Sequence, residues 1–304
     1  MAKDLIIGVV DNYDWDKIKY WANSIKKSGF TGHKAVIAYN MDAATVNKLT
    51  AEDFMIVGCT AFDQYRGFVY NIGDNNSIMV DRFMHIYQML EQLEQQNGIE
   101  RVIATDVRDV VFQSNPSEWL DNYLLSSQDM IIGSENMNYE DEPWGSNNMT
   151  QAFGEFFSAR FVKREINCAG VVGGRLDAFK DFCLNIYLMC RGLNPKTPGG
   201  GGPDQAALNI LLACEAYAKR TAFTNPANGW VVHAGTSLPA IQAGSGGIGQ
   251  AYKANPSMQL RFVNRIDYSV HNDEIYANDK KVTIVHQWDR VPEWKTLVER
   301  KFGV

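Results

Sequence analysis

The chain has 304 residues, 45% hydrophobic and 21% charged, a composition that excludes a disordered or low-complexity protein. Its formal net charge of −6 provides no basic excess for binding nucleic acid or an anionic membrane surface. The five cysteines form no CxxC or CxxH pattern, which argues against a disulfide framework and for a reducing compartment. The first ten residues lack the features of a signal peptide, and no apolar run approaches the roughly 18 residues of a membrane span. We therefore expect a cytoplasmic protein.

Strands and helices alternate through the first half of the chain. Short apolar runs predict strands, and segments with hydrophobic residues on one face predict helices. The expected strands are Leu5–Val10, His33–Tyr39, Phe54–Gly58, Arg101–Thr105 and Met130–Gly133. The expected helices are Trp15–Lys27, Ala43–Leu49, Met79–Gln95 and a short one that begins at Pro116. This alternation is typical of an α/β fold whose mostly parallel central sheet is flanked by helices.

The second half is less regular, and we expect it to lie over the rim of the sheet without a separate domain boundary. Loops are expected at Ser134–Asn148, Pro195–Pro203 and Gly244–Gly249, the last of them mobile. Helices are expected at Asp177–Arg191 and Asp204–Tyr217. Strands are expected at Glu165–Gly174, Gly229–His233, Arg261–Asn264 and Val282–Val285.

Polar side chains follow two of the predicted strands directly. Asp11, Asn12 and Tyr13 follow the first strand, and Asp106 and Asp109 follow the strand that ends at Thr105. In open α/β sheets ligands bind beyond the carboxyl ends of the strands, so both groups should lie on one rim. Carboxylates there suit Mg²⁺ or Mn²⁺ together with substrate phosphates. The same acids would also fit a salt-bridged turn.

Further candidates have a structural and a functional interpretation each. His286 follows a late strand, where it is either a satisfied histidine or a third metal ligand. Asp204 begins a helix, either as an N-cap or first-turn acid or as a carboxylate near a reacting carbon. Arg82 is either a solvated helix residue or a contact to phosphate. Asn167 and Gly170 lie in a strand rich in small residues, where a sugar could approach the backbone.

The order of these motifs resembles that of the GT-A glycosyltransferases, and among them family 8. The landmarks in chain order are Val10-Asp11-Asn12-Tyr13, Arg82 in Val80-Asp81-Arg82-Phe83, Asp106-Val107-Arg108 at the place of a DxD motif, Ile166-Asn167-Cys168-Ala169-Gly170, Asp204-Gln205 and His286. The chain departs from the family in three places, one of which is Trp144, a residue with no place in the family 8 pattern. Arg108 replaces the second acid of DxD, and the C-terminal His-x-x-Gly-x-x-Lys-Pro-Trp pattern is missing.

Three arrangements at the DxD-like motif stay open. Asp106 and Asp109 can share a metal ion, Asp106 can hold it without Asp109, or Arg108 can replace the cation. The last is chemically reasonable because a guanidinium can bind a diphosphate in a bidentate way.

The resemblance implies a single GT-A domain over residues 1–304, with a nucleotide-binding half at 1–133 and an acceptor- and sugar-binding half at 134–304. It implies metal-assisted transfer of a sugar from a nucleotide-diphosphate sugar, a UDP-sugar by preference, to a hydroxyl of a glycan acceptor. The donor would contact Asp11, Asn12, Tyr13, Arg82, Asp106, Val107, Arg108, Asn167 and Gly170. Mn²⁺ or Mg²⁺ would be held by Asp106, Asp109 and His286.

Asp204 and Gln205 would lie nearest the anomeric carbon. For the acceptor sugar, Tyr139 and Trp144 are the candidate stacking residues. Two alternatives remain. A sugar-1-phosphate nucleotidyltransferase shares this layout but usually carries a glycine-rich basic loop after its first strand, where this chain has Val10–Asp14. A non-catalytic carbohydrate-binding protein on a transferase fold is suggested by Arg108. The sequence leaves the sugar, the stereochemistry and the oligomeric state open.

Overall fold

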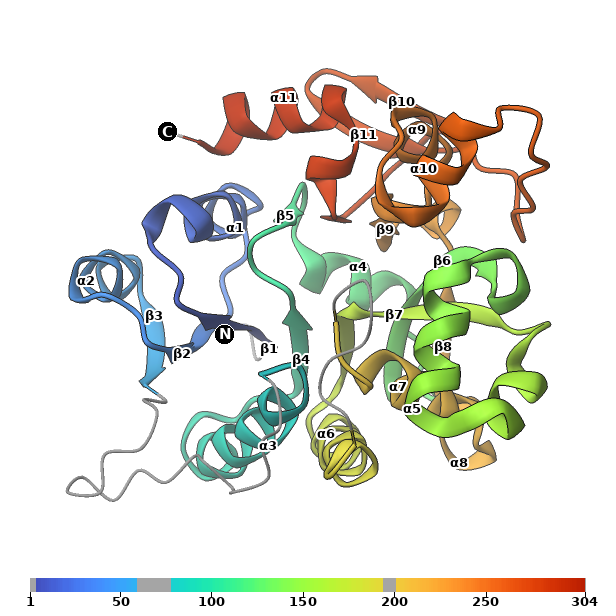
Figure 1. Ribbon diagram of the computed structural model, residues 1–304. Coiled ribbons are helices and arrows are strands. Elements are labelled where there is room, and N and C mark those ends of the chain that lie inside the picture. Colours follow the sequence, from blue (N-terminus) through green and yellow to red (C-terminus); the bar gives the residue numbers. More distant parts are fainter. Residues whose placement is uncertain (1–3, 59–77, 194–200, 304) are drawn as a thin grey trace.

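The computed structural model describes residues 4–58, 78–193 and 201–303, which build a central seven-stranded sheet (Figure 1). The strand order is β3-β2-β1-β4-β7-β6-β8. The strands are β1 (Asp4–Asp11), β2 (His33–Tyr39), β3 (Phe54–Gly58), β4 (Arg101–Thr105), β6 (Met130–Asn138), β7 (Glu165–Arg175) and β8 (Thr221–Thr224). Only β7 runs antiparallel to its neighbours in this sheet. The predicted α/β class with a mostly parallel sheet is confirmed.

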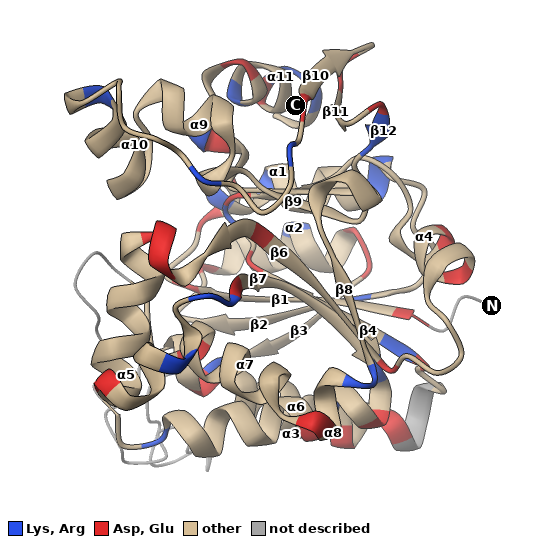
Figure 2. Cartoon of the chain, turned by 90° about the vertical axis from the view of Figure 1, so that its right-hand side faces the viewer, with Lys and Arg blue, Asp and Glu red and all other residues tan. Residues whose placement is uncertain are grey.

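Helices cover both faces of the central sheet, which explains why its strands are apolar on both sides (Figure 2). One face packs against α3 (Ile78–Asn97), α6 (Leu176–Cys190) and α7 (Asp204–Ala213). The other packs against α1 (Trp15–Lys27), α2 (Ala43–Ala51) and α4 (Pro116–Tyr123). Helix α1 begins as predicted, because the Asp14 carboxylate accepts a hydrogen bond from the backbone N–H of Lys17.

A smaller sheet brings the C-terminal third of the chain over the rim. It consists of β5 (Val110–Phe112), β13 (Ile284–His286) and β9 (Val231–His233), with β13 in the middle. Behind it, a third hydrophobic cluster joins α11 (Pro292–Phe302) to the strands β10 (Tyr268–His271) and β11 (Glu274–Ala277). Strand β12 (Lys280–Lys281) pairs with β11. Because β5 follows β4 directly, this sheet holds His286 beside the acids that end β4.

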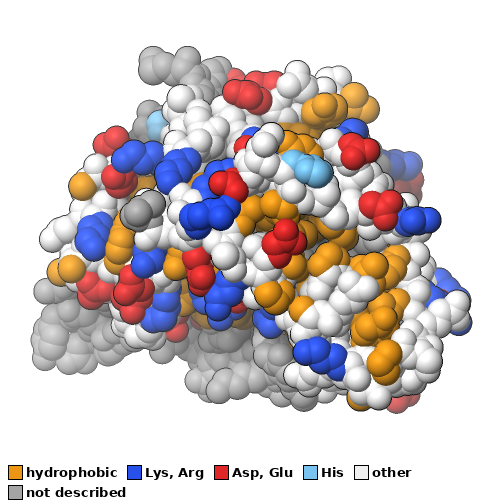
Figure 3. All heavy atoms as spheres, turned by 90° about the horizontal axis from the view of Figure 1, so that it is seen from above, with side chains coloured by type: hydrophobic (Ala, Val, Ile, Leu, Met, Phe, Trp, Pro, Cys, Tyr) orange, Lys and Arg blue, Asp and Glu red, His pale blue; other side chains and the backbone are white. Residues whose placement is uncertain are grey.

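In the part of the chain that the structure describes, the outer face of this C-terminal part has no large patch of side chains with one sign of charge (Figure 3). Figure 3 shows basic and acidic side chains interspersed over this face, with hydrophobic side chains gathered on one side of it. Among the described helices, none combines the length and the hydrophobicity that a bilayer-spanning segment needs.

The segment 134–148, expected as a polar loop, is ordered secondary structure. Strand β6 continues to Asn138, and η1 (Tyr139–Asp141) and α5 (Pro143–Phe161) follow. Helix α5 starts here because the Glu142 carboxylate accepts hydrogen bonds from the N–H groups of Trp144 and Gly145, and Pro143 occupies the first helical position. The helix is interrupted at Gly154, whose φ is +80°.

Other expectations for the second half were wrong in detail. Residues 244–249 contain the short junction between α9 (Leu238–Ala243) and α10 (Gly246–Ala254) and the first turn of α10. Gly244 ends α9 as a left-handed cap. Residues 261–264 form no strand, and Asn264 bonds instead to Asn136. Helix α7 ends at Ala213 and α8 (Glu215–Ala218) follows it. Three short 3-10 turns complete the order, η2 (Pro226–Asn228), η3 (Ala234–Thr236) and η4 (Trp288–Arg290). Most of the glycine loop at 195–203 lies outside the described residues.

The last residue of β4 is tied to α1 by a buried hydrogen bond, and this bond can be tested. The indole N–H of Trp21 donates to Thr105 Oγ1 over 2.8 Å, and both side chains are buried. We predict that Thr105→Val, which leaves this N–H without an acceptor, lowers the free energy of unfolding by about 1–3 kcal/mol in urea titrations. The control Thr50→Val, on the exposed face of α2, should change it by less than about 0.5 kcal/mol. Equal effects of the two substitutions would contradict this role of the bond.

Candidate functional site

A cavity of about 560 Å³ opens at the carboxyl end of β4, between the central sheet and the C-terminal part of the chain. This volume lies within the range of small-molecule sites. The residues that line it come from α3, the turn after β4, β6, α5, β7, α7, α10, β13 and η4, among other segments. They include eight that the sequence singled out, Arg82, Asp106, Arg108, Trp144, Gly170, Asp204, Gln205 and His286. The rim predicted from strand ends therefore coincides with a cavity.

Arg82 joins two of the candidate acids. Its Nη1 lies 2.7 Å from Asp106 Oδ1 and its Nη2 lies 2.6 Å from Asp204 Oδ2, and only 12% of the arginine side chain is exposed. Burial by itself would lower the pKa of Arg82, but the charges of Asp204 and Asp106 outweigh it and raise that pKa. Burial likewise opposes ionisation of Asp106, yet Arg82 and then His286 hold the pKa of Asp106 well below its usual range. Asp106 is therefore an ionised carboxylate.

Asp204 is the first residue of α7, and Pro203 occupies the cap position. Asp204 is therefore not the N-cap but an acid in the first turn of α7, and its carboxylate accepts a hydrogen bond from Arg82. Burial raises the pKa of Asp204 and Arg82 opposes that rise. The neighbouring Gln205 is also buried, and its side-chain carbonyl accepts a hydrogen bond from the N–H of Ala169.

Asp106, Asp109 and His286 form a group that could hold a metal ion. One donor atom of each lies within 4.8 Å of the other two. His286 Nε2 is 3.5 Å from Asp106 Oδ2 and 3.9 Å from Asp109 Oδ1. Two carboxylates and one imidazole suit a divalent cation such as Mn²⁺ or Mg²⁺, so the residues present fit the expected ion.

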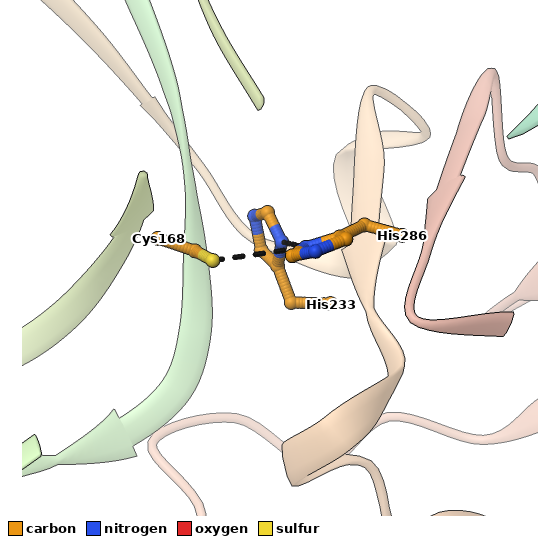
Figure 4. Close-up of side chains that lie close together, drawn as sticks. All are labelled: Cys168, His233 and His286. Carbon is orange, nitrogen blue, oxygen red and sulfur yellow. Dashed lines mark hydrogen bonds between the residues drawn. The ribbon is translucent and has the colours of Figure 1, made fainter. Parts of the chain in front are cut away.

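The opposite edge of the His286 ring faces two residues that the sequence analysis missed (Figure 4). His286 Nδ1 lies 2.9 Å from Nδ1 of His233 and 3.7 Å from Sγ of Cys168. Burial and then His286 lower the pKa of His233 well below its ordinary value, so His233 is neutral. Nδ1 of His233 can then accept a hydrogen bond from the Nδ1–H of His286, which leaves Nε2 of His286 for the carboxylate side. His233 and His286 are register neighbours on β9 and β13.

These three residues, Cys168, His233 and His286, form a second group with metal-ligand spacing, of softer donors than the first. Both groups use His286, one through each ring nitrogen. The protonation state of His286 depends on the carboxylate side. Burial lowers the pKa of His286, but Asp106 and Asp109 outweigh burial and raise it.

Gly170 makes room for the His286 ring. A Cβ at this position would lie 2.3 Å from Cε1 of His286, closer than any real contact. The Gly170 carbonyl also accepts a hydrogen bond of 2.8 Å from the N–H of Asp106. Gly170 thus fixes the distance between β7, the end of β4 and the imidazole.

The turn after β1 lies on the rim but not in the cavity lining. Asn12 has a φ of +54°, and its N–H donates to the carbonyl of Tyr39. Tyr13 is half-buried. Burial raises the pKa of Tyr13, and the charge of Arg108 opposes that rise, so Arg108 lies within electrostatic range of its hydroxyl. The Val107 side chain is buried in the core and can offer only backbone to a ligand.

Two basic side chains flank the acids at the cavity mouth. Arg108 is about half exposed and lies 3.3 Å from Asp109 Oδ2. Arg290, in η4, also lines the cavity. Between His286 and η4, Gln287 adopts a left-handed backbone with φ of +59°. It is held there because its N–H donates to the Asp109 carbonyl and its Oε1 accepts from the Gly235 N–H.

Two expected sugar contacts do not reach the cavity. The Tyr139 ring is buried against Phe161, with ring centroids 5.8 Å apart, and offers no face on which an acceptor sugar could stack. Asn167 is bonded through its backbone and side chain to Asn209, and neither residue lines the cavity. Trp144, in contrast, does line it.

Glu135 is one of two glutamates in the cavity lining that the sequence analysis missed, and the other is Glu142. Glu135 lies on β6, and its Oε1 accepts a hydrogen bond of 3.0 Å from Gln205 Nε2. Burial, reinforced by the nearby charge of Glu142, raises the pKa of Glu135 to about 7. The residue lies within Ser134–Asn148, which was predicted as loop, so no strand periodicity directed attention to its side chain.

The chain was compared with known proteins. No protein-family model matches it, and no curated protein matches it. The resemblance to the GT-A glycosyltransferases therefore stays a prediction from the motifs.

The close approach of Gly170 to His286 predicts a coupled pair of mutations. Gly170→Ala should lower the free energy of unfolding by about 1–3 kcal/mol, because the new methyl group overlaps the imidazole. In a His286→Ala background the same substitution should cost much less, which chemical denaturation of all four proteins would reveal as a coupling energy. Gly58→Ala, where a Cβ meets no atom within 4 Å, is the matched control. An equal cost of Gly170→Ala in both backgrounds would contradict this packing.

Proposed function

We propose that the protein is a GT-A type glycosyltransferase that transfers a sugar from a UDP-sugar to a hydroxyl of a carbohydrate acceptor. The observation that supports this most is the convergence of Asp106, Asp109 and His286 beside the Arg82–Asp204 pair in one cavity at the carboxyl end of β4. Arg82, the acids after β4, Asp204 and His286 are far apart in the sequence and lie close together there.

The charges of the cavity support a bound cation. Asp106 and Asp204 share the buried guanidinium of Arg82, and Asp109 lies against the half-exposed Arg108, so three aspartates face two arginines. An anionic diphosphate would add to this negative excess, so its binding needs further positive charge. Asp106, Asp109 and His286 would hold Mn²⁺ or Mg²⁺. When bound, such a cation stabilises the diphosphate leaving group as a Lewis acid.

The other residues at the cavity would contact different parts of the donor and acceptor. Arg108 and Arg290 have exposed guanidinium groups at the cavity and can bind phosphate oxygens. Both Nη atoms of Arg82 already bind carboxylates, so Arg82 acts on the donor through the orientation of Asp106 and Asp204. The turn Asp11–Tyr13 would hold the uridine. The sugar would lie toward Gly170, Asp204 and Gln205, with Trp144 at the acceptor side.

Metal-dependent UDP binding tests the donor assignment. We predict that UDP binds in calorimetry with Mn²⁺ present and loses most of its affinity in excess chelator. Asp106→Asn should lower turnover of the UDP-sugar by at least ~10²-fold, as expected when one stabilising contact to the leaving group is lost. Asp16→Asn, an exposed acid on α1, is the control and should leave both quantities unchanged. UDP affinity and turnover that persist in chelator would instead favour Arg108 as the charge partner.

Asp204 can be tested by a substitution that keeps its shape. Asp204→Asn removes the negative charge opposite Arg82, and we predict a fall in turnover of ~10²-fold or more with little change in UDP affinity. Circular dichroism and the thermal midpoint would show whether the variant is folded. A folded variant with wild-type turnover would remove Asp204 from the reaction.

A further inference from the structure

Glu135 and Asp204 are two cavity acids with opposite surroundings. Asp204 is paired with a buried guanidinium at 2.6 Å. Among the described residues, no lysine or arginine forms an ion pair with Glu135, and its hydrogen-bond partners are the neutral amide of Gln205 and the thiol of Cys168. A carboxylate paired with a guanidinium is a poor proton acceptor, because protonation would leave the arginine charge buried and unpaired. An acid without a cationic partner has no such cost.

The groups around Glu135 set its affinity for a proton. Glu142 and Tyr139 face it from the segment that follows β6, Cys168 faces it from β7, and His286 acts on it from β13. Burial and Glu142 raise the pKa of Glu135, while Gln205, Cys168 and His286 lower it. Near pH 7 both forms of the carboxyl are therefore populated, as an efficient general base requires.

We propose that Glu135 is the general base of the glycosyl transfer and takes the proton of the acceptor hydroxyl. The inference rests on the proposed function. Glu135 is open to the same cavity as Asp204 and Gln205, and its bond to Gln205 ties it to the residue expected beside the anomeric carbon.

In the transfer step, each bond that forms is matched by one that breaks. The acceptor oxygen forms a bond to the anomeric carbon as its O–H bond breaks, and the proton passes to the Glu135 carboxylate. The bond from the anomeric carbon to the diphosphate oxygen breaks, and its electron pair leaves with UDP. Glu135 then releases the proton to solvent. Asp204 keeps its charge and its pairing with Arg82 throughout.

Water can replace the unknown acceptor in the test. UDP release would be measured from pH 5 to 9 with UDP-glucose, UDP-galactose, UDP-N-acetylglucosamine and UDP-xylose, in the presence of Mn²⁺. The wild-type rate should rise through an apparent pKa of about 7. Glu135→Gln should lower the rate by ~10²-fold and abolish this rise, whereas Asp204→Asn should keep it at its reduced rate.

Glu165→Gln is the matched control. Glu165 is a half-buried acid with a pKa raised by burial, it lies on β7 opposite Asn138 of β6, and it is outside the cavity lining. This control should keep both the rate and the pH profile. A Glu135→Gln protein with the wild-type profile would overturn the assignment, and so would a covalent glycosyl adduct on Glu135 detected by mass spectrometry.

The pH dependence of the protein's stability tests the titration of Glu135 without a measurement of turnover. A carboxyl whose pKa is raised on folding keeps a proton that the unfolded chain releases, so its contribution to stability falls as pH rises from about 4.5 to about 7. Glu135→Gln should remove this fall, and its thermal midpoint should gain on the wild type across that window. No relative gain would contradict the surroundings described for Glu135. A wild-type protein that neither binds UDP nor releases it would refute the proposed function and the base assignment together.

Discussion

The guanidinium of Arg82, held between Asp106 and Asp204, is the interaction on which the site depends. It joins α3, the end of β4 and the start of α7, three elements that no short stretch of sequence connects. Each of these charges would be costly to bury without partners, and removal of one member of such a pair typically costs about 3–5 kcal/mol. The pairing therefore fixes the relative positions of the two acids nearest the proposed diphosphate and sugar.

The same cavity contains carboxyl groups of two kinds, and their surroundings separate them. Asp106, next to Arg82 and His286, is ionised. Glu135, next to an amide and a thiol, titrates near neutrality. A reaction that needs a permanent negative charge at one point and a proton acceptor at another can use this difference. The neutral His233 adds a third element, since it restrains the ring of His286 from the side opposite the acids.

Much of the first half could be predicted from the sequence, because parallel strands buried on both faces are continuous apolar runs. Strands β1 to β4 lie where those runs are, and the acids at their ends lie on one rim. The segment that contains Glu135 and Tyr139 could not be assigned in this way. Its strand is polar where it borders the cavity, so alternation of apolar and polar residues does not mark it. The contact of His233 with His286 depends on the register of two strands far apart in the sequence, which no local pattern encodes.

The most direct test of the central claim is an X-ray structure with UDP and Mn²⁺, with anomalous data collected at the manganese absorption edge. We predict an anomalous peak among the carboxylates of Asp106 and Asp109 and Nε2 of His286, in contact with the diphosphate. Bound UDP without such a peak, its diphosphate lying on Arg108 and Arg290, would contradict the cation-dependent site, and UDP bound away from this cavity would contradict the assignment of the rim.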